Sequence, residues 1–474
     1  MSLKDLLLGE KIRMRIERDS MGEMSVPDEA LYGASTQRAV LNFPISSKRL
    51  QPDFIRALGY IKKYAALVNC ELGKLLQQKS EVISLAADEV ISGALYSQFV
   101  VDVYQTGSGT STNMNANEVI ANRAIELLGK ERGDRTRIHP NDDVNLGQSS
   151  NDVFPSALHI AAVLMLKEKL IPALTNLASV LHNKESEFND IVKAGRTHLQ
   201  DATPITLGQE FSGYASQIEQ NKERLEKLIY EVSELPLGGT AVGTGLNTDP
   251  DFAEKVIELI NKDTGCAFYE AKNHFSAQAT QDSIVALSGG LKTLACSLIK
   301  IANDIRWLGA GPRCNLGELN LPAIQPGSSI MPGKVNPVVC ESVMMVACQV
   351  IGYDTTIALA NQHSNFELNT MMPVMAYSLL DGIKILSTVI NVFAEKCISG
   401  IVANIERCKF LAEASLSNCT SLAPVIGYDT TAKVAKKALQ ENLSVKEAAL
   451  ALGVVDKDKV DEIINVKKMT KNKI

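Results

Sequence analysis

Apolar residues recur at spacings of three and four along three long stretches of the chain. This heptad-like spacing is typical of long helices that pack against other helices. The pattern therefore predicts a mainly α fold with a bundle of long helices at its centre. Seams of this length are also expected to need helices of other chains to cover them. The seam residues are Ile160, Val163, Leu170, Leu174, Leu177 and Leu181; Ile284, Leu287, Leu291, Leu294, Leu298, Ile301, Ile305 and Leu308; and Leu379, Ile383, Leu386, Ile390, Phe393, Cys397 and Ile401.

Turn-rich polar segments interrupt the helical pattern and suggest three domains. RTRIHPNDDVNLGQSSNDVFP precedes the long helices, and SLAPVIGYDTT begins a shorter, more charged region. The predicted domains are an N-terminal domain at residues 1–147, a central long-helix bundle at 148–404 and a small helical C-terminal domain at 405–474. Pro172 and Pro373 lie within the apolar patterns and should start or kink helices. Strand signals are few, and only short hairpins near the N-terminus, around MGEMSVP, are predicted.

Composition narrows the class of protein. Of the 474 residues, 45% are hydrophobic and 22% are charged, which is typical of a soluble globular protein. The net charge of −6 argues against broad nucleic-acid binding. No uninterrupted run of about 18 apolar residues is present, so no membrane span is expected. The N-terminal run Leu6–Leu8 is too short for a signal-peptide core. Together with nine Cys that form no C-x-x-C pair, this favours reduced core thiols and a cytoplasmic location.

Four polar stretches at helix edges or in loops offer hydroxyls, amides or backbone N–H groups. Helix N-termini present free N–H donors and positive partial charge, so the stretches together indicate a shared carboxylate site. For any single stretch, ordinary N-capping is the alternative. The last stretch adds a serine pair and a lysine that is expected to be buried between prolines. The stretches are TGSGTSTNMNANE (residues 106–118), HPNDDVNLGQSSND (139–152), GRTHLQDATP (195–204) and IQPGSSIMPGKVNP (324–337).

A Gly-rich stretch and the spacing of the histidines argue against a phosphate-binding loop and a metal site. The Gly-rich PLGGTAVGTGLN lacks a preceding strand signal and the spacings of a phosphate loop, so a tight turn between helices is expected. The six His include no H-x-x-x-H pair, so no metal site is expected.

In their order along the chain, the polar stretches resemble the fumarase/aspartase superfamily, and class II fumarases within it. GSSIMPGKVNP resembles the signature loop, and HPNDDVN, QSSNDVFP, GRTHLQDATP, PLGGTAVGTGLNT and NFELN match in sequence order. The resemblance covers nearly the whole chain. It implies a three-domain, mainly α fold whose central long-helix bundle forms a homotetramer core. It also implies sites shared between chains and no metal or organic cofactor.

The reaction implied by the resemblance is the reversible hydration of fumarate to L-malate through an aci-carboxylate intermediate. Ser328 matches the family's catalytic base and His198 its acid-side histidine. Glu341 matches the carboxylate that orients this histidine, directly or across a chain boundary. Lys334 matches the cation that binds a carboxylate of the small dicarboxylate substrate. The other implied substrate-binding residues are Ser108, Gly109, Thr110, Ser149, Ser150, Asn151, Thr197, Ser329, Val335 and Asn336.

The resemblance also implies a secondary, non-catalytic dicarboxylate site. It would consist of His139, Pro140, Asn141 and Asp142. A polar turn that satisfies its own hydrogen bonds is the alternative. The chain has Leu146-Gly147 where fumarases commonly have Lys-Ser, which weakens the expectation of this site.

Aspartate ammonia-lyase is the main alternative function, because it shares the fold, the base serine and the fumarate product. Aspartases tend to have Thr at the position of Ser150 and to lack the aromatic residue found here as Phe366, so both residues favour fumarase. A non-catalytic homologue would be expected to lack Ser328, His198 or Lys334, and all three are present.

Overall fold

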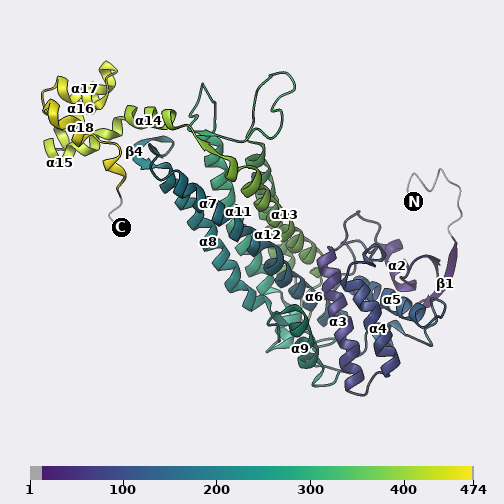
Figure 1. Cartoon of the computed structure of the whole chain (residues 1–474). Helices are drawn as coiled ribbons and strands as arrows, with labels where there is room; N and C mark the ends of the chain where they lie inside the picture. The colour runs from purple at the N-terminus through teal and green to yellow at the C-terminus, as the bar shows by residue number, and fades with distance from the viewer. Residues whose placement is uncertain (1–12, 472–474) are drawn as a thin grey trace. The chain divides into compact units, whose positions relative to one another are not determined.

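The computed structural model describes residues 13–471 and is mainly α, as the helical seams predict (Figure 1). The chain divides into two compact units made of interleaved segments. Unit 1 contains the chain up to Ile171, Glu223–Thr293 and Gln349–Leu386, and unit 2 contains Pro172–Lys222, Leu294–Cys348 and the chain from Ser387 onward. The first division falls after Ile171, and the other four fall inside long helices, α8 (Leu207–Val232), α11 (Asp282–Leu308), α12 (Val338–Gln362) and α13 (Met372–Lys396). The predicted boundaries of three domains stay a prediction.

Unit 1 is organised around α3, which packs against α4, α6 and α9 (Figure 1). An antiparallel hairpin, β1–β2, precedes these helices and confirms the strands predicted near the N-terminus. The elements are β1 (Met14–Asp19), β2 (Gly22–Pro27), α2 (Ala34–Asn42), α3 (Pro52–Glu71), α4 (Gln77–Ile91), η1 (Tyr96–Gln98), α5 (Thr110–Leu127), η2 (Pro140–Val144), α6 (Ser150–Met165), η3 (Leu166–Leu170), β5 (Glu234–Leu235), α9 (Phe252–Thr264), β6 (Tyr269–Glu270) and α10 (His274–Ala279).

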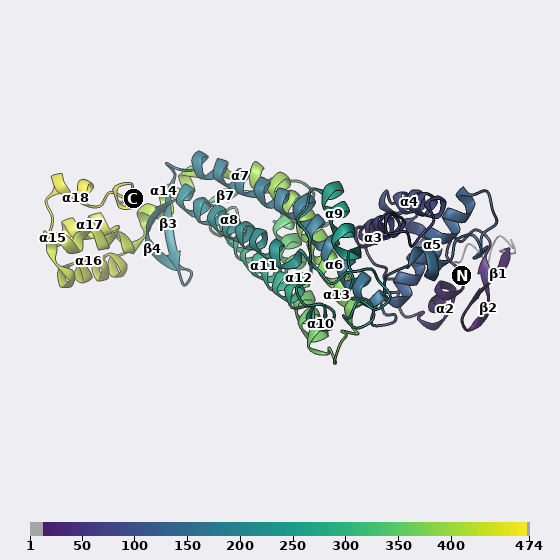
Figure 2. The same ribbon diagram turned by 90° about the horizontal axis from the view of Figure 1, so that it is seen from below.

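Unit 2 contains a second antiparallel hairpin, β3–β4, which lies beside α14 (Figure 2). A small cluster of C-terminal helices has its own apolar core, which includes Leu422, Val434 and Ala448. The elements are α7 (Ile171–Glu187), β3 (Val192–Thr197), β4 (Gln200–Thr206), β7 (Leu319–Asn320), η4 (Ile398–Gly400), β8 (Val402–Ala403), α14 (Ile405–Ala414), η5 (Leu416–Leu422), α15 (Ala423–Ile426), α16 (Tyr428–Glu441), α17 (Val445–Ala451), α18 (Lys457–Ile463) and η6 (Lys468–Thr470).

The three apolar seams are buried at every position, from Ile160 to Leu181, from Ile284 to Leu308 and from Leu379 to Ile401. The expectation that other chains must cover the seams is therefore wrong, because this chain covers them itself. Pro373 is the second residue of α13 and starts that helix. Pro172 instead follows the π-helical turn η3 within one continuous helical stretch that runs from α6 into α7. Proline is tolerated at the start of α13 because the first turn needs no intrahelical N–H bond.

Part of the apolar surface of α12 is exposed instead. Met345 and Leu359 on this helix are more than half exposed. By length and composition, α11, α12 and Met372–Gly400 are apolar enough to cross a membrane, and only 33% of the apolar window of α12 is buried. The sequence expectation was based on uninterrupted apolar runs, whereas mean hydropathy also admits windows that contain charged residues, such as Lys292 in α11 and Asp354 in α12.

The cysteines only partly follow their expected placement. All nine are free, and Cys340, Cys397 and Cys408 are buried, whereas Cys296, Cys314 and Cys348 are exposed. The expectation of core thiols holds for the first three. The Leu6–Leu8 run lies outside the described residues.

Candidate active site

Two helix N-termini converge in unit 1, at the starts of α5 and α6. The Ser108 and Thr110 hydroxyl oxygens lie 2.9 Å apart, and that of Thr110 lies 2.7 Å from Ser150 Oγ. This hydroxyl cluster joins Ser108, Thr110 and Ser150 at the starts of two helices. Such an arrangement suits a carboxylate, because N–H donors and the positive ends of two helix dipoles face the same place.

Gly109 allows this close approach. Its φ of 77° lies in the left-handed region, and a Cβ there would lie 2.0 Å from the Phe154 ring on α6. Gly109 is also the N-cap of α5 and provides no side-chain cap, so Thr110 is not a capping residue. Ser149, by contrast, caps α6 through a capping box with Asp152. Ordinary N-capping therefore accounts for Ser149 but not for Thr110.

Hydrogen bonds to Asp152 connect the start of α6 to the Gly-rich stretch PLGGTAVGTGLN. Its buried carboxylate accepts hydrogen bonds from the backbone N–H groups of Ser149, Gly238 and Thr240, at 2.9 to 3.0 Å. Burial raises the pKa of Asp152, although these three bonds oppose the shift. Asn151 Nδ2 donates to Ala241 O at 2.8 Å. The Gly-rich stretch is a turn, as expected, but it connects β5 to α9 and follows a short strand rather than a helix.

The HPND segment forms the short helix η2, which starts at Pro140. His139 Nδ1 accepts hydrogen bonds from the backbone N–H groups of Asn141, at 3.2 Å, and Asp142, at 3.0 Å. Polar groups of the segment thus form hydrogen bonds with one another, which is what we expect of a polar turn without a bound dicarboxylate. The secondary dicarboxylate site stays a prediction.

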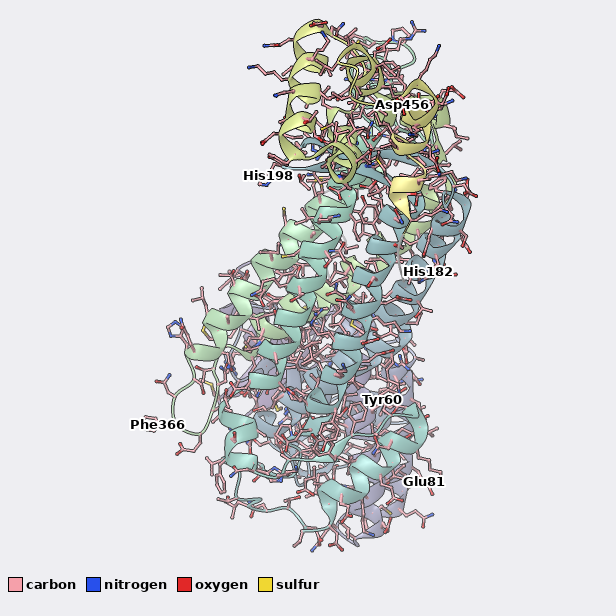
Figure 3. The ribbon with its side chains drawn as sticks, turned by 90° about the vertical axis from the view of Figure 1, so that its left-hand side faces the viewer. Tyr60, Glu81, His182, His198, Phe366 and Asp456 are labelled. Carbon is pink, nitrogen blue, oxygen red and sulfur yellow. The ribbon has the colours of Figure 1, made fainter. Side chains whose placement is uncertain are left out.

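His198 lies in the turn of the β3–β4 hairpin, in unit 2. Thr197 pairs with Gln200, so His198 and Leu199 form a two-residue loop, and both have positive φ, 56° and 59°. Of the two predicted settings, helix edge or loop, His198 lies in a loop, and α8 begins only at Leu207. A bulky residue such as Leu199 rarely adopts positive φ, and such strain concentrates at functional sites. Figure 3 shows His198 at the edge of the ribbon, pointing away from it.

A buried ion pair holds this hairpin to the segment that precedes the signature loop. Arg196 Nη1 lies 2.7 Å from Glu318 Oε2, and the Glu318 side chain is fully buried. Glu318 directly precedes β7, which leads into the loop. Sequence patterns did not single out this pair, because the two residues are 122 positions apart.

The signature loop surrounds Ser328 with backbone donors. Ser328 Oγ accepts hydrogen bonds from the N–H groups of Ile330, at 3.2 Å, and Met331, at 3.1 Å. Gly327 and Lys334 close the loop through a backbone hydrogen bond of 2.9 Å. Ser329, Lys334 and Val335 are exposed, so the expectation of a buried lysine is wrong.

Several predicted residues line one cavity of about 610 Å³ in unit 2. Lys334, Val335, Asn336 and Glu341 face this space, together with Arg306 of α11, which the sequence did not single out. His198 and Ser328 are not among its lining residues. Glu341 lines this cavity and His198 does not, and the orientation of His198 by Glu341, directly or across a chain boundary, stays a prediction. Residues 13–471 hold no group of three or more His, Cys, Asp or Glu placed for a metal ion.

Comparison with known proteins places the chain in a family. A family model described as lyase matches residues 22–352, and one described as fumarase C C-terminus matches residues 419–471. The class II fumarate hydratase of Nitrosomonas europaea is 52% identical, over 96% of this chain and 99% of that protein. The chain belongs to the class II fumarate hydratase family. The class II fumarate hydratase of Helicobacter pylori, strain J99, is 48% identical over 97% of this chain and 99% of its own length.

Solved structures of this family share the fold. The class II fumarase of Schistosoma mansoni has a TM-score of 0.93 and 39% identity, covering 96% of this chain and 99% of that one. A fumarate lyase of Brucella melitensis also has a TM-score of 0.93, with 44% identity, covering 97% of this chain and 100% of that one. The mainly α fumarase/aspartase fold implied by the sequence is therefore confirmed.

Proposed function

We propose that this protein catalyses the reversible hydration of fumarate to L-malate. The observation that carries this proposal is membership of the class II fumarate hydratase family, since two of its members are 52% and 48% identical to this chain over nearly its full length. The converging N-termini of α5 and α6 support it, since they provide donors for a carboxylate. The exposed Lys334 adds a cation that a dianionic substrate requires.

In the dehydration direction, Ser328 acts as the base. Its alkoxide removes a proton from the malate carbon next to one carboxylate, and the electron pair of that C–H bond moves into the carboxylate to give the aci-carboxylate. A free serine is far too weak for this step. The backbone N–H groups of Ile330 and Met331 support the role, because donors to the oxygen favour its charged form.

Loss of water completes the reaction. The electron pair forms the C=C bond as the C–O bond breaks, and His198 gives the departing hydroxyl a proton, so that water and fumarate result. Glu341 of another chain orients His198. Lys334 and Asn336 bind the carboxylate that gains charge, and interactions that strengthen in this way lower the barrier.

The site is completed by several chains of a homotetramer in the cytoplasm. The absence of His198 and Ser328 from the cavity that Lys334 and Glu341 line supports shared sites. The exposed apolar residues of α12 support burial against other copies, because large apolar surfaces mark interaction sites.

The test is a comparison of two substrates. Purified protein is given L-malate or L-aspartate, and fumarate is followed by its ultraviolet absorbance. We expect fumarate from malate alone. Fumarate and ammonia from aspartate, with none from malate, would instead establish an aspartate ammonia-lyase.

A further inference from the structure

Lys62 of α3 is an unusual lysine, because it is fully buried without a carboxylate as its hydrogen-bond partner. Its Nζ donates to Asn145 Oδ1 and to Gln148 Oε1, each at 2.9 Å. Other buried lysines of this chain have an anionic partner: Lys184 lies 2.7 Å from Glu187 and Lys193 lies 3.1 Å from Glu210. A buried ammonium bound by neutral amides is costly, which points to a role other than stability.

The two amides lead directly to the candidate substrate-binding residues. Asn145 Oδ1 also accepts from Asn113 Nδ2, at 3.1 Å, and Asn113 lies one turn after Thr110 on α5. Asn145 Nδ2 donates to Gln148 O, at 3.0 Å, directly before Ser149 and α6. One ammonium therefore ties α3 to both helix N-termini that carry the hydroxyl cluster of Ser108, Thr110 and Ser150.

Two opposing influences act on the charge of Lys62. Burial lowers its pKa to about 7, and the negative charge of Asp152 on α6 opposes this shift. Titratable groups on the other elements packed against α3 have partners of their own. These pairs are Asp88 with Lys63, Asp143 with Lys79, Asp263 with Tyr64, and Glu118 with the N-terminal amides of α2.

We propose that Lys62 is a positioning residue that holds the hydroxyl cluster and becomes protonated as the dicarboxylate binds. This inference rests on the proposed function for the identity of the ligand class. A dianion at the N-termini of α5 and α6 adds negative charge beside Lys62 and stabilises its ammonium. By linkage, protonation of Lys62 strengthens dianion binding by the same factor. Affinity should then fall as the pH rises above about 7.

The experiment measures proton uptake on binding of succinate, a four-carbon dicarboxylate with no hydroxyl to eliminate. Calorimetric titrations at pH 7.5 in buffers of different ionisation enthalpy give the protons taken up per site. The wild type should take up a fraction of a proton, and His198→Asn should retain this uptake. Lys62→Met should lose the uptake, and at pH 6, where Lys62 of the wild type is mostly protonated, it should bind succinate about 5- to 150-fold more weakly, the usual range of such couplings.

Two variants separate charge from packing. Lys62→Arg keeps a permanent charge, so succinate should bind without proton uptake and with little dependence on pH. Lys63→Met, which removes a neighbouring surface lysine paired with Asp88, should behave as the wild type. If Lys62→Met fails to fold, Lys62→Arg and the wild type still decide the outcome.

No uptake in the wild type, or equal uptake in the wild type and Lys62→Arg, would overturn the role of Lys62. Either result leaves hydration intact if malate still yields fumarate. Conversely, succinate-linked uptake that depends on Lys62 in a protein that does not convert malate would refute the proposed function and leave the Lys62 inference standing.

Discussion

Ser328 is the residue on which the proposed chemistry depends most. Ser328→Ala should lower kcat by about 10²–10⁴-fold, the usual contribution of a general base, with a small change in KM. The base acts only as the proton leaves, so its removal raises the energy of the transition state and leaves substrate binding nearly unchanged. Steady-state malate dehydration gives both constants. Ser329→Ala, at the adjacent proposed binding residue, should mainly raise KM. An unchanged kcat in Ser328→Ala would contradict the assignment.

Lys62 also predicts a pH dependence of stability. Its pKa is about 7 in the fold and near 10.4 in an unfolded chain, so between these values the unfolded state binds more protons. The free energy of unfolding of the wild type, relative to Lys62→Met, should therefore rise with pH above about 7. The slope should approach about 1.4 kcal/mol per pH unit. Urea unfolding of both proteins from pH 7 to pH 9, without ligand, measures it; a constant difference would contradict it.

The position of Lys62 was visible in the sequence, although its role was not. Leu58, Lys62 and Ala66 are spaced by four and all lie on the buried face of α3, whereas Lys63 falls outside that face. A lysine in an apolar stripe is a signal that sequence reasoning can use. Its partners could not be predicted, because Asn145 and Gln148 lie more than eighty residues away.

At the scale of elements, Gly327 lies where the two ends of the signature loop meet, and its N–H group donates to Lys334 O. A Cβ at Gly327 would lie 2.4 Å from Lys334 O, so Gly327→Ala must move the backbone that closes the loop. We expect kcat/KM to fall by at least about tenfold, equivalent to about 1.4 kcal/mol, with little change in melting temperature, because the loop is mostly exposed. Malate turnover and thermal unfolding measure the two effects.

Gly333 provides the matched control within the same loop. It has a φ of 79°, but a Cβ there would meet nothing within 4 Å. Gly333→Ala therefore introduces only backbone strain, of about 1–2 kcal/mol, and should impair turnover less than Gly327→Ala. Equal effects would mean that loop strain in general, rather than the contact with Lys334, determines activity.

Elements were predictable where burial sets the residue pattern. The seams of α11 and α13 follow heptad spacing because one face of each helix is buried. Every seam position is buried, although Cys397 and Ile401 lie beyond the end of α13. The β3–β4 hairpin was missed because its turn is His198-Leu199, not the Asn-Gly pair that favours positive φ at both positions. Its place is set by tertiary contacts such as Arg196–Glu318, which no local pattern reveals.

At the scale of the whole molecule, the reason for assembly differs from the one that the sequence suggested. The seams are covered within the chain, so their length does not require partners. The exposed apolar residues of α12, such as Met345 and Leu359, now support the proposed homotetramer. Helical periodicity identifies which residues face a core, but it does not tell whether a second apolar face meets solvent or another chain.

Shared sites predict complementation between inactive variants. His198→Ala and Ser328→Ala should each be nearly inactive, because each removes a distinct step. If two chains supply these residues to one site, a hybrid tetramer still forms sites with neither defect. With independent supply in an equal mixture, about a quarter of sites should be intact.

The measurement is malate dehydration after the two variants are unfolded and refolded together. Each variant refolded alone, and the two mixed after separate refolding, serve as controls. Mass spectrometry of tagged chains establishes that hybrids form. We expect the co-refolded sample to regain activity well above all controls. Hybrid tetramers without regained activity would mean that one chain supplies both His198 and Ser328 to each site, because every chain in the mixture lacks one of them. The shared site would then have to be abandoned, and loop closure would have to bring Ser328 to the His198 turn of its own chain.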